Sequence, residues 1–152
     1  MRQEIVIGVD GGASKTRAIS QTLFGDTIGK GEAGEGNIHQ NLEQAYQSVL
    51  EAINRSLAPI NVELGDPKYQ FHIGLGLAGS EVSVCKEAFL KKKLPSKSLI
   101  VESDAHVACM GAHAGHDGAV ISIGTGVVGY QTYQRNVYRV GGWGFPYGDE
   151  GR

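Results

Sequence analysis

The first thirty residues carry the hydrophobic pattern of a small β-meander. An apolar segment at residues 4–10 predicts a buried strand, and apolar and polar positions alternate through residues 16–24 as in its hairpin partner. A turn at Phe24-Gly25-Asp26 leads toward a third strand near residues 27–30. The opening pattern therefore predicts three consecutive strands.

A helical period follows a loop that contains Gly34, Gly36 and Asn37. One apolar stripe repeats at helical spacing: Leu42, Ala45, Tyr46, Val49, Leu50, Ile53 and Leu57. Because proline cannot continue a helix, Pro59 ends this one. The pattern thus changes from strands to a helix of about four turns.

Two further strand–helix pairs are predicted between residues 70 and 115. The segment 70–78 suits a buried parallel strand, and Ser80 is positioned to cap a helix that runs to about Leu94. Residues 98–102 form a short strand, and Asp104 opens a helix over residues 105–114 that Gly115 closes. The predicted order is β-β-β-α-β-α-β-α, an α/β domain.

The strand pattern of the opening returns after residue 118. An apolar run at residues 119–123 meets the turn Gly124-Thr125-Gly126, and strands follow at 127–133 and 137–140. Because a lone hairpin has little partner surface, we expect the natural protein to be about twice as long. We predict one domain over residues 1–116 and the start of a second, similar domain over residues 117–152.

Charge and composition narrow the class of protein. The 152 residues include 14 Lys and Arg against 16 Asp and Glu, a formal charge of -2 that favours neither nucleic acid nor an anionic membrane as a partner. The N-terminus enters a strand without a secretory segment, and no apolar run approaches the ~20 residues of a membrane span. We expect a cytoplasmic location.

The two cysteines, Cys85 and Cys109, fall on apolar helix faces and predict packed thiols.

Candidate chemistry begins at the first turn, Asp10-Gly11-Gly12-Ala13-Ser14-Lys15-Thr16. A strand that ends on a carboxylate can hold hydrated Mg²⁺, and glycines let backbone N–H groups approach phosphate oxygens. Lys15-Thr16 invites a Walker A interpretation, but that motif needs glycines at Val9 and Ser14 and a helix afterwards. Strand residues follow instead, so we favour a phosphate-binding β-hairpin.

The second turn matches G-x-G-x-x-G at Gly124 to Gly129. A dinucleotide site of that type needs a helix after the turn, whereas the residues from Val127 to Tyr133 are β-branched and aromatic. We therefore favour a second phosphate turn over a Rossmann site. Two such turns facing each other would hold a nucleotide from both sides.

Three more residues carry alternative interpretations. Asp104 follows a strand and starts a helix, so it is either a simple N-cap or, beside two phosphate turns, a general base for a substrate hydroxyl. Trp143 between glycines is either core filling or a platform for a sugar ring. Asp149 is either a sugar-binding carboxylate or part of an acidic turn.

Taken in order, these motifs resemble the amino-sugar kinases of the BadF/BadG-type ATPase family, in the superfamily of sugar kinases and actin. The resemblance covers nearly the whole chain and is carried by segments beginning at Val9, Gly36, Gly76, Ser103, Ile123, Gly141 and Gly148. It implies a ribonuclease H-like, actin-like ATPase domain for the first part of the chain. Glucosamine or N-acetylglucosamine is the implied substrate, with ATP and Mg²⁺ as cofactors.

The resemblance also implies roles for individual residues. Asp104 would be the catalytic base and Asp10 would hold Mg²⁺ through water. The residues that would contact ATP are Asp10, Gly11, Gly12, Ser14, Lys15, Thr16, Thr125 and Gly126. Those at sugar-contacting positions are Asn37, Gly79, Ser80, Gly142, Trp143, Gly144 and Asp149.

The expected reaction is transfer of a phosphoryl group to the 6-hydroxyl of the amino sugar. Val127-Val128 stands where relatives often place a serine, which leaves the choice between a free and an acetylated amine open. Because the adenine-binding segment belongs to the second domain, we expect these 152 residues to be inactive alone. Two alternatives stay open, an ATPase that activates a CoA-ester dehydratase or reductase and a non-catalytic sugar-binding module. A homodimer is also open.

Overall fold

The computed structural model describes residues 2–123 and 127–143. The chain forms two compact units, Met1–Asp104 and Ala105–Arg152. The first unit holds the residues of the first predicted turn, and the second holds a smaller sheet. Four predicted site residues, Thr125, Gly126, Gly144 and Asp149, lie outside the described residues. The domain boundary after residue 116 stays a prediction.

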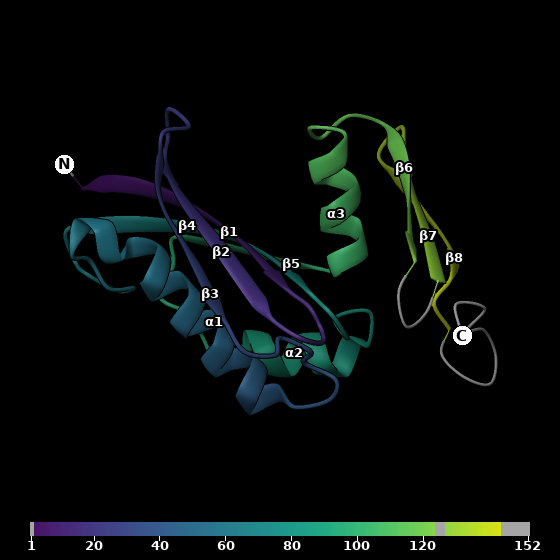
Figure 1. Ribbon diagram of the computed structural model, residues 1–152, viewed down its shortest axis with the longest axis horizontal. Helices are drawn as coiled ribbons and strands as arrows, with labels where there is room; N and C mark the ends of the chain where they lie inside the picture. The colour runs from purple at the N-terminus through teal and green to yellow at the C-terminus, as the bar shows by residue number, and fades with distance from the viewer. Residues whose placement is uncertain (1, 124–126, 144–152) are drawn as a thin grey trace. The chain divides into compact units, whose positions relative to one another are not determined.

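A five-stranded mixed sheet forms the first unit (Figure 1). Its strands are β1 (Gln3–Gly11), β2 (Thr16–Thr22), β3 (Thr27–Ala33), β4 (Tyr69–Leu77) and β5 (Ser98–Glu102). The order across the sheet is β3-β2-β1-β4-β5, with the first three strands antiparallel and β1, β4 and β5 parallel. The predicted meander is confirmed, and β3 extends three residues beyond its expected end at residue 30.

Helix α1 (Leu42–Leu57) covers one face of this sheet. It begins where the Asn41 side chain accepts a hydrogen bond from the Gln44 amide, at 3.0 Å, and it ends before the short 3₁₀ helix η1 (Ala58–Ile60) that contains Pro59. The face toward the sheet is fully buried: Ala45, Val49, Ala52, Ile53 and Leu57. The strands contribute alternate residues to the same core: Ile5, Ile7, Val9, Phe71, Ile73 and Leu75. The predicted stripe is therefore the core face of the helix.

Small residues allow α1 to approach β2 and β3 closely. An ideal Cβ on Gly31 would lie 2.0 Å from the Ala52 carbonyl oxygen, so only glycine fits there without movement of backbone. The Ser20 hydroxyl donates a 2.8 Å hydrogen bond to the Ser56 carbonyl oxygen across the same interface. Strand and helix are thus held both by packing and by a buried hydrogen bond.

Helix α2 (Ser83–Leu90) is shorter than the sequence predicted, and the prediction that Ser80 caps it is wrong. Ser80 does not cap it, because residues 78–82 form turns and the N-cap residue, Val82, offers no side-chain acceptor. Gly79 has φ +85, which turns the chain before a helix can start. The helix packs against α1 through an edge-on contact of the Tyr46 and Phe89 rings, whose centroids are 5.8 Å apart.

The second unit carries a three-stranded antiparallel sheet. Its strands are β6 (Gly118–Ile123), β7 (Val127–Tyr133) and β8 (Asn136–Gly141), and helix α3 (Asp104–Ala112) precedes them. Gln134 and Arg135 have φ 48 and 65, the left-handed pair that a tight hairpin turn needs, and they join the two strands predicted at residues 127–133 and 137–140. The Cys109 thiol is fully buried against Thr132, with Sγ 3.8 Å from the Thr132 hydroxyl oxygen.

Candidate phosphate and substrate site

The first predicted turn joins β1 to β2 as a hairpin. Gly11 pairs with Thr16, and the Gly12 amide donates a 2.9 Å hydrogen bond to the Lys15 carbonyl oxygen. The next three residues, Ala13, Ser14 and Lys15, are exposed, and their amides donate to no other described residue. Three neighbouring free N–H groups can bind an anion such as a phosphate oxygen. This hairpin turn, residues 11–16, is called the phosphate turn below.

Side chains of the phosphate turn differ in accessibility. Asp10, at the end of β1, is exposed, as is Ser14. The Lys15 ammonium lies 3.8 Å from a Glu32 carboxylate oxygen, which directs it toward β3. Thr16 is fully buried, and its hydroxyl has no hydrogen-bond partner among the described residues. In this conformation the Thr16 hydroxyl is therefore out of reach of a ligand.

Two backbone hydrogen bonds connect the phosphate turn to two other loops, and a third connects those loops to each other. The Gly36 amide donates to the Gly12 carbonyl oxygen at 2.8 Å, and the Ala78 amide donates to the Gly11 carbonyl oxygen at 2.8 Å. The Ile38 amide donates to the Ala78 carbonyl oxygen at 3.0 Å. These bonds close a ring between residues 11–12, 36–38 and 78, which we call the three-loop junction.

Asn37 lies between Gly36 and Ile38 in this junction. Its Oδ1 accepts hydrogen bonds from the amides of His39, at 3.0 Å, and Gln40, at 3.2 Å. The oxygen is thus occupied in shaping its own loop, whereas the side-chain NH₂ has no partner among the described residues. Asn37 can therefore offer a donor to a ligand acceptor such as a hydroxyl or carbonyl oxygen.

Gly79 lies against the same loop, and Ser80 follows it in the chain. A Cβ on Gly79 would come within 2.8 Å of the Asn37 Oδ1 and within 2.7 Å of the His39 amide nitrogen. The Ser80 hydroxyl is buried and has no partner among the described residues. An unpaired buried hydroxyl costs free energy, and the Ser80 hydroxyl keeps unused hydrogen-bonding capacity.

Strand register places the two predicted acidic residues at one edge of the sheet. Asp10 pairs with Gly76 on β4, and Gly76 pairs with Glu102 on β5. Adjacent strands are about 4.8 Å apart, so the backbones of Asp10 and Glu102 are about 10 Å apart. Asp104 follows two residues later as the first residue of α3, which the sequence predicted over residues 105–114 and which ends at Ala112. The carboxyl ends of parallel strands are where α/β sheets bind ligands.

Trp143 lies in the second unit and is mainly exposed, at 63 %, so it does not fill a core among the described residues. The guanidinium carbon of Arg139 lies 5.0 Å from the centroid of its ring. Such a cation–π contact fixes the orientation of the indole. The preceding Gly142 has φ 69, which a side chain would strain.

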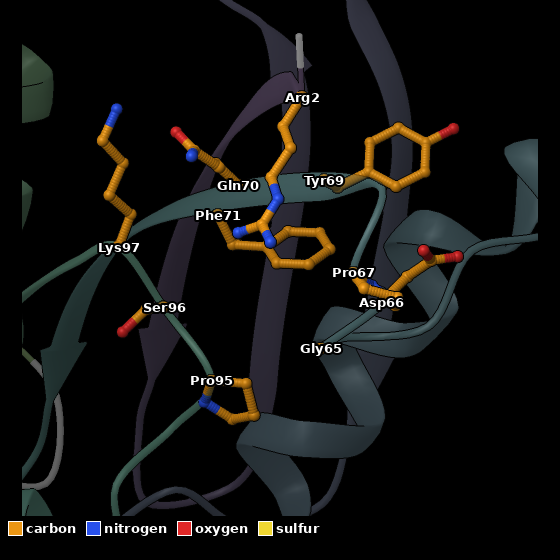
Figure 2. A pocket seen from close by; sticks show the side chains of 10 residues that line it. All are labelled: Arg2, Gly65, Asp66, Pro67, Tyr69, Gln70, Phe71, Pro95, Ser96 and Lys97. Atoms are coloured by element: carbon orange, nitrogen blue, oxygen red, sulfur yellow. The ribbon is translucent and has the colours of Figure 1, made fainter.

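A separate hollow lies at the opposite end of β1 and β4, where Arg2, Tyr69, Phe71 and Lys97 are among the lining residues (Figure 2). The Lys97 side chain points away from the Phe71 ring, and its ammonium donates a 2.6 Å hydrogen bond to Glu4. None of the predicted site residues lines this hollow. The length of β1 separates this hollow from the phosphate turn.

The cysteines do not form a metal centre in the described part of the chain. Cys109 is buried, and Cys85 is half-buried against the first core. Residues 2–123 and 127–143 contain no cluster of three or more His, Cys, Asp or Glu side chains suited to a metal ion. No helix in these residues is long and apolar enough to cross a membrane.

Residues 7–152 match the BadF/BadG/BcrA/BcrD ATPase family. The chain belongs to this family. The predicted resemblance is thereby confirmed, and so is the α/β fold class of sugar kinases and actin-like ATPases.

Two curated relatives cover nearly the whole chain. A glucosamine kinase of Vibrio cholerae is 35% identical over 145 residues, which are 95% of this chain and 49% of the relative. An N-acetylmuramic acid/N-acetylglucosamine kinase of Clostridium acetobutylicum is 30% identical over 151 residues, 96% of this chain and 48% of the relative. The chain spans about half the length of the curated relatives that it matches.

A solved structure from Chromobacterium violaceum, described as a candidate N-acetylglucosamine kinase, superposes with a TM-score of 0.87 at 27% identity. The superposition covers 97% of this chain and 52% of that protein's chain. The two proteins therefore share one fold over nearly all of this chain. Sequence reasoning gave Gly36 no role of its own, although its position beside Asn37 was a signal that could have directed attention to it.

Proposed function

We propose that this chain carries the amino-sugar side of an ATP-dependent kinase that phosphorylates the 6-hydroxyl of glucosamine or N-acetylglucosamine. The observation that supports the proposal is the strand register, which places Asp10 and the phosphate turn at the same end of the sheet as Glu102, two residues before Asp104. The names of the two curated relatives support an amino sugar as the substrate class. Cytoplasmic location and dimerisation stay predictions.

The residues present suit MgATP. Asp10 offers an exposed carboxylate, the oxygen ligand that Mg²⁺ prefers, and the phosphate turn offers three free amides for phosphate oxygens. Bound MgATP would supply the phosphoryl group, and its Mg²⁺ would neutralise negative charge on the phosphates. Asp10 would hold the hydrated metal. The free amides of Ala13, Ser14 and Lys15 would bind phosphate, and Gly11 and Gly12 would shape the turn that carries them. Thr125 and Gly126 are proposed for the opposite side of the phosphates.

Asp104 is the proposed catalytic base. It would accept the proton of the sugar hydroxyl as that oxygen attacks the phosphoryl group, which requires the carboxylate to lie within hydrogen-bond reach of the hydroxyl. It lies in the first turn of α3, where the positive end of the helix dipole attracts negative charge. Asn37, Gly79 and Ser80 would orient the sugar, with Gly142, Trp143, Gly144 and Asp149 as further contacts.

An ATPase that activates a CoA-ester enzyme through an iron–sulfur cluster is the other candidate within the family. No described arrangement favours it, because the Cys109 thiol faces Thr132 and backbone carbonyl oxygens inside the second unit. Iron analysis and visible absorbance of anaerobically purified protein separate the two functions. A bound cluster would support the activator, and its absence together with sugar binding would support the kinase.

Calorimetry on the 152-residue chain tests the proposal directly. We expect glucosamine or N-acetylglucosamine to bind with a dissociation constant in the millimolar range, about 4 kcal/mol of binding free energy, and ATP to bind weakly or not at all. Glucose is the control for the amine. Absence of binding by both amino sugars would contradict the substrate assignment, and tight ATP binding would contradict the expected division of the site.

A further inference from the structure

We propose that Gly36 is a positioning residue that couples the Asn37 loop to the phosphate turn. The inference rests on the proposed function, because it concerns how the sugar and phosphate parts of the same site are held together. Gly36 itself contacts neither ligand in the proposed mechanism. Its contribution is transmitted through the three-loop junction.

The packing of Gly36 leaves no room for a side chain. An ideal Cβ would lie 2.6 Å from the Gly11 Cα, 2.9 Å from the Gly11 carbonyl carbon and 2.6 Å from the Thr16 hydroxyl oxygen. Two of these three atoms are backbone and cannot rotate away. Any residue larger than glycine must therefore displace either the phosphate turn or the loop that carries Asn37.

The hydrogen bonds of the junction explain why such a displacement would spread. Gly36 donates to Gly12, Ala78 donates to Gly11, and Ile38 donates to Ala78. Movement of the phosphate turn away from Gly36 therefore stretches the bond to Ala78, and through it the bond that holds Ile38. Asn37 lies between Gly36 and Ile38, two of the residues that donate these hydrogen bonds. Binding of phosphate at the turn and of sugar at Asn37 thus act on one packed unit.

The loop provides a matched control. A Cβ on Gly34 would meet only side-chain ends, the Ser48 hydroxyl at 3.3 Å and the Gln44 amide nitrogen at 3.4 Å, and both can shift by a few tenths of an ångström. Gly34→Ala and Gly36→Ala therefore add the same methyl group to the same loop. Only the second substitution presses on backbone of the phosphate turn.

Amide hydrogen exchange followed by NMR on the 152-residue chain tests the coupling. In Gly36→Ala we expect the amides of Ile38 and Ala78 to lose protection by at least about tenfold, while the amide of Ile73 in the core of β4 keeps its protection. Gly34→Ala should match the wild type at all three amides. Unchanged protection of Ile38 and Ala78, or an equal loss at Ile73, would overturn the positioning role.

A second measurement needs no substitution and covers the case in which Gly36→Ala fails to fold. In the wild type, the amides of Gly36, Ile38 and Ala78 should exchange through one common opening, with the same dependence on denaturant. Independent exchange of the three amides would overturn the proposal.

Titrations of the same labelled protein with glucosamine and with N-acetylglucosamine separate this inference from the proposed function. In the wild type and in Gly34→Ala, the chemical shifts of the Gly11 and Gly12 amides should change together with those of the Asn37 loop. In Gly36→Ala, the changes at Gly11 and Gly12 should be lost. Shifts confined to the Asn37 loop in the wild type would overturn the coupling. No shifts with either amino sugar would overturn the proposed function, while the exchange results would still decide the role of Gly36 in the junction.

Discussion

Gly31 on β3 and Ala52 on α1 approach so closely that an ideal Cβ on Gly31 would lie 2.0 Å from the Ala52 carbonyl oxygen. The contact joins the edge of the meander to the helix that covers it. Since helix backbone cannot rotate out of the way, added volume at residue 31 must separate β3 from α1.

We therefore expect Gly31→Ala to lower the free energy of unfolding by about 1–3 kcal/mol, the usual range for overpacking. Gly74→Ala is the control, because a Cβ at Gly74 meets nothing within 4 Å and alanine suits a strand slightly better than glycine. Urea unfolding of both variants measures the difference. Equal stability of the two variants would contradict the close packing of α1 on β3.

Asn37 offers a substitution that separates loop shape from ligand binding. In Asn37→Asp the side chain keeps an oxygen for the amides of His39 and Gln40 but loses its NH₂ donor. We expect unchanged thermal stability and an amino-sugar affinity reduced by about tenfold, the loss of one hydrogen bond of about 1.4 kcal/mol. Calorimetry measures the affinity. Sugar binding of wild-type strength would remove Asn37 from the site.

Glu4 supplies a pH-dependent prediction. The hydrogen bond from the Lys97 ammonium lowers the pKa of the Glu4 carboxyl below its ordinary value, and its charge adds to the effect. A carboxyl with a lowered pKa in the folded state contributes stability above its unfolded pKa, and this contribution is lost as pH falls through the folded pKa.

In Lys97→Met the pKa of Glu4 should rise, and stability should depend less on pH on the acid side. Carboxyl NMR titration follows the pKa, and urea unfolding across the acid range follows the stability. Lys91→Met, which removes an exposed charge at the end of α2, is the control. A Glu4 pKa that does not change in Lys97→Met would show that this ion pair does not form in solution.

Trp143 is the only tryptophan of the chain, so its fluorescence reports on one position. Arg139 lies against the ring, which is otherwise mainly exposed. If the ring is a sugar platform, saturating amino sugar should shift its emission to shorter wavelength as water leaves the exposed face. Sugar binding detected by calorimetry without any change in this emission would place the sugar away from Trp143.

The fold of the first unit was largely predictable from the sequence, because local patterns and tertiary packing agree there. The apolar stripe of α1 and the proline after it define a helix with one core face, and the alternation in β1 and β2 defines a hairpin. The helix after Ser80 was misplaced because a serine after a strand resembles an N-cap, whereas the positive φ of Gly79 continues the turn.

The site was predicted as residue types but not as an arrangement. Glycines in the turn after Asp10 indicated phosphate binding from local chemistry alone. The contact of Gly36 with Gly11 and the burial of the Thr16 hydroxyl depend on how separate loops meet, which no local pattern contains.

The central claim is that Asp104 of this chain removes a proton from an amino sugar during phosphoryl transfer. A hybrid enzyme tests it, in which this chain replaces the matching part of the Vibrio cholerae glucosamine kinase. We expect the hybrid to consume ATP in an amino-sugar-dependent reaction, and the same hybrid with Asp104→Asn to bind the sugar but react about 10²–10⁴ times more slowly. An Asp104→Asn hybrid that folds and turns over at the rate of the unsubstituted hybrid would contradict the claim.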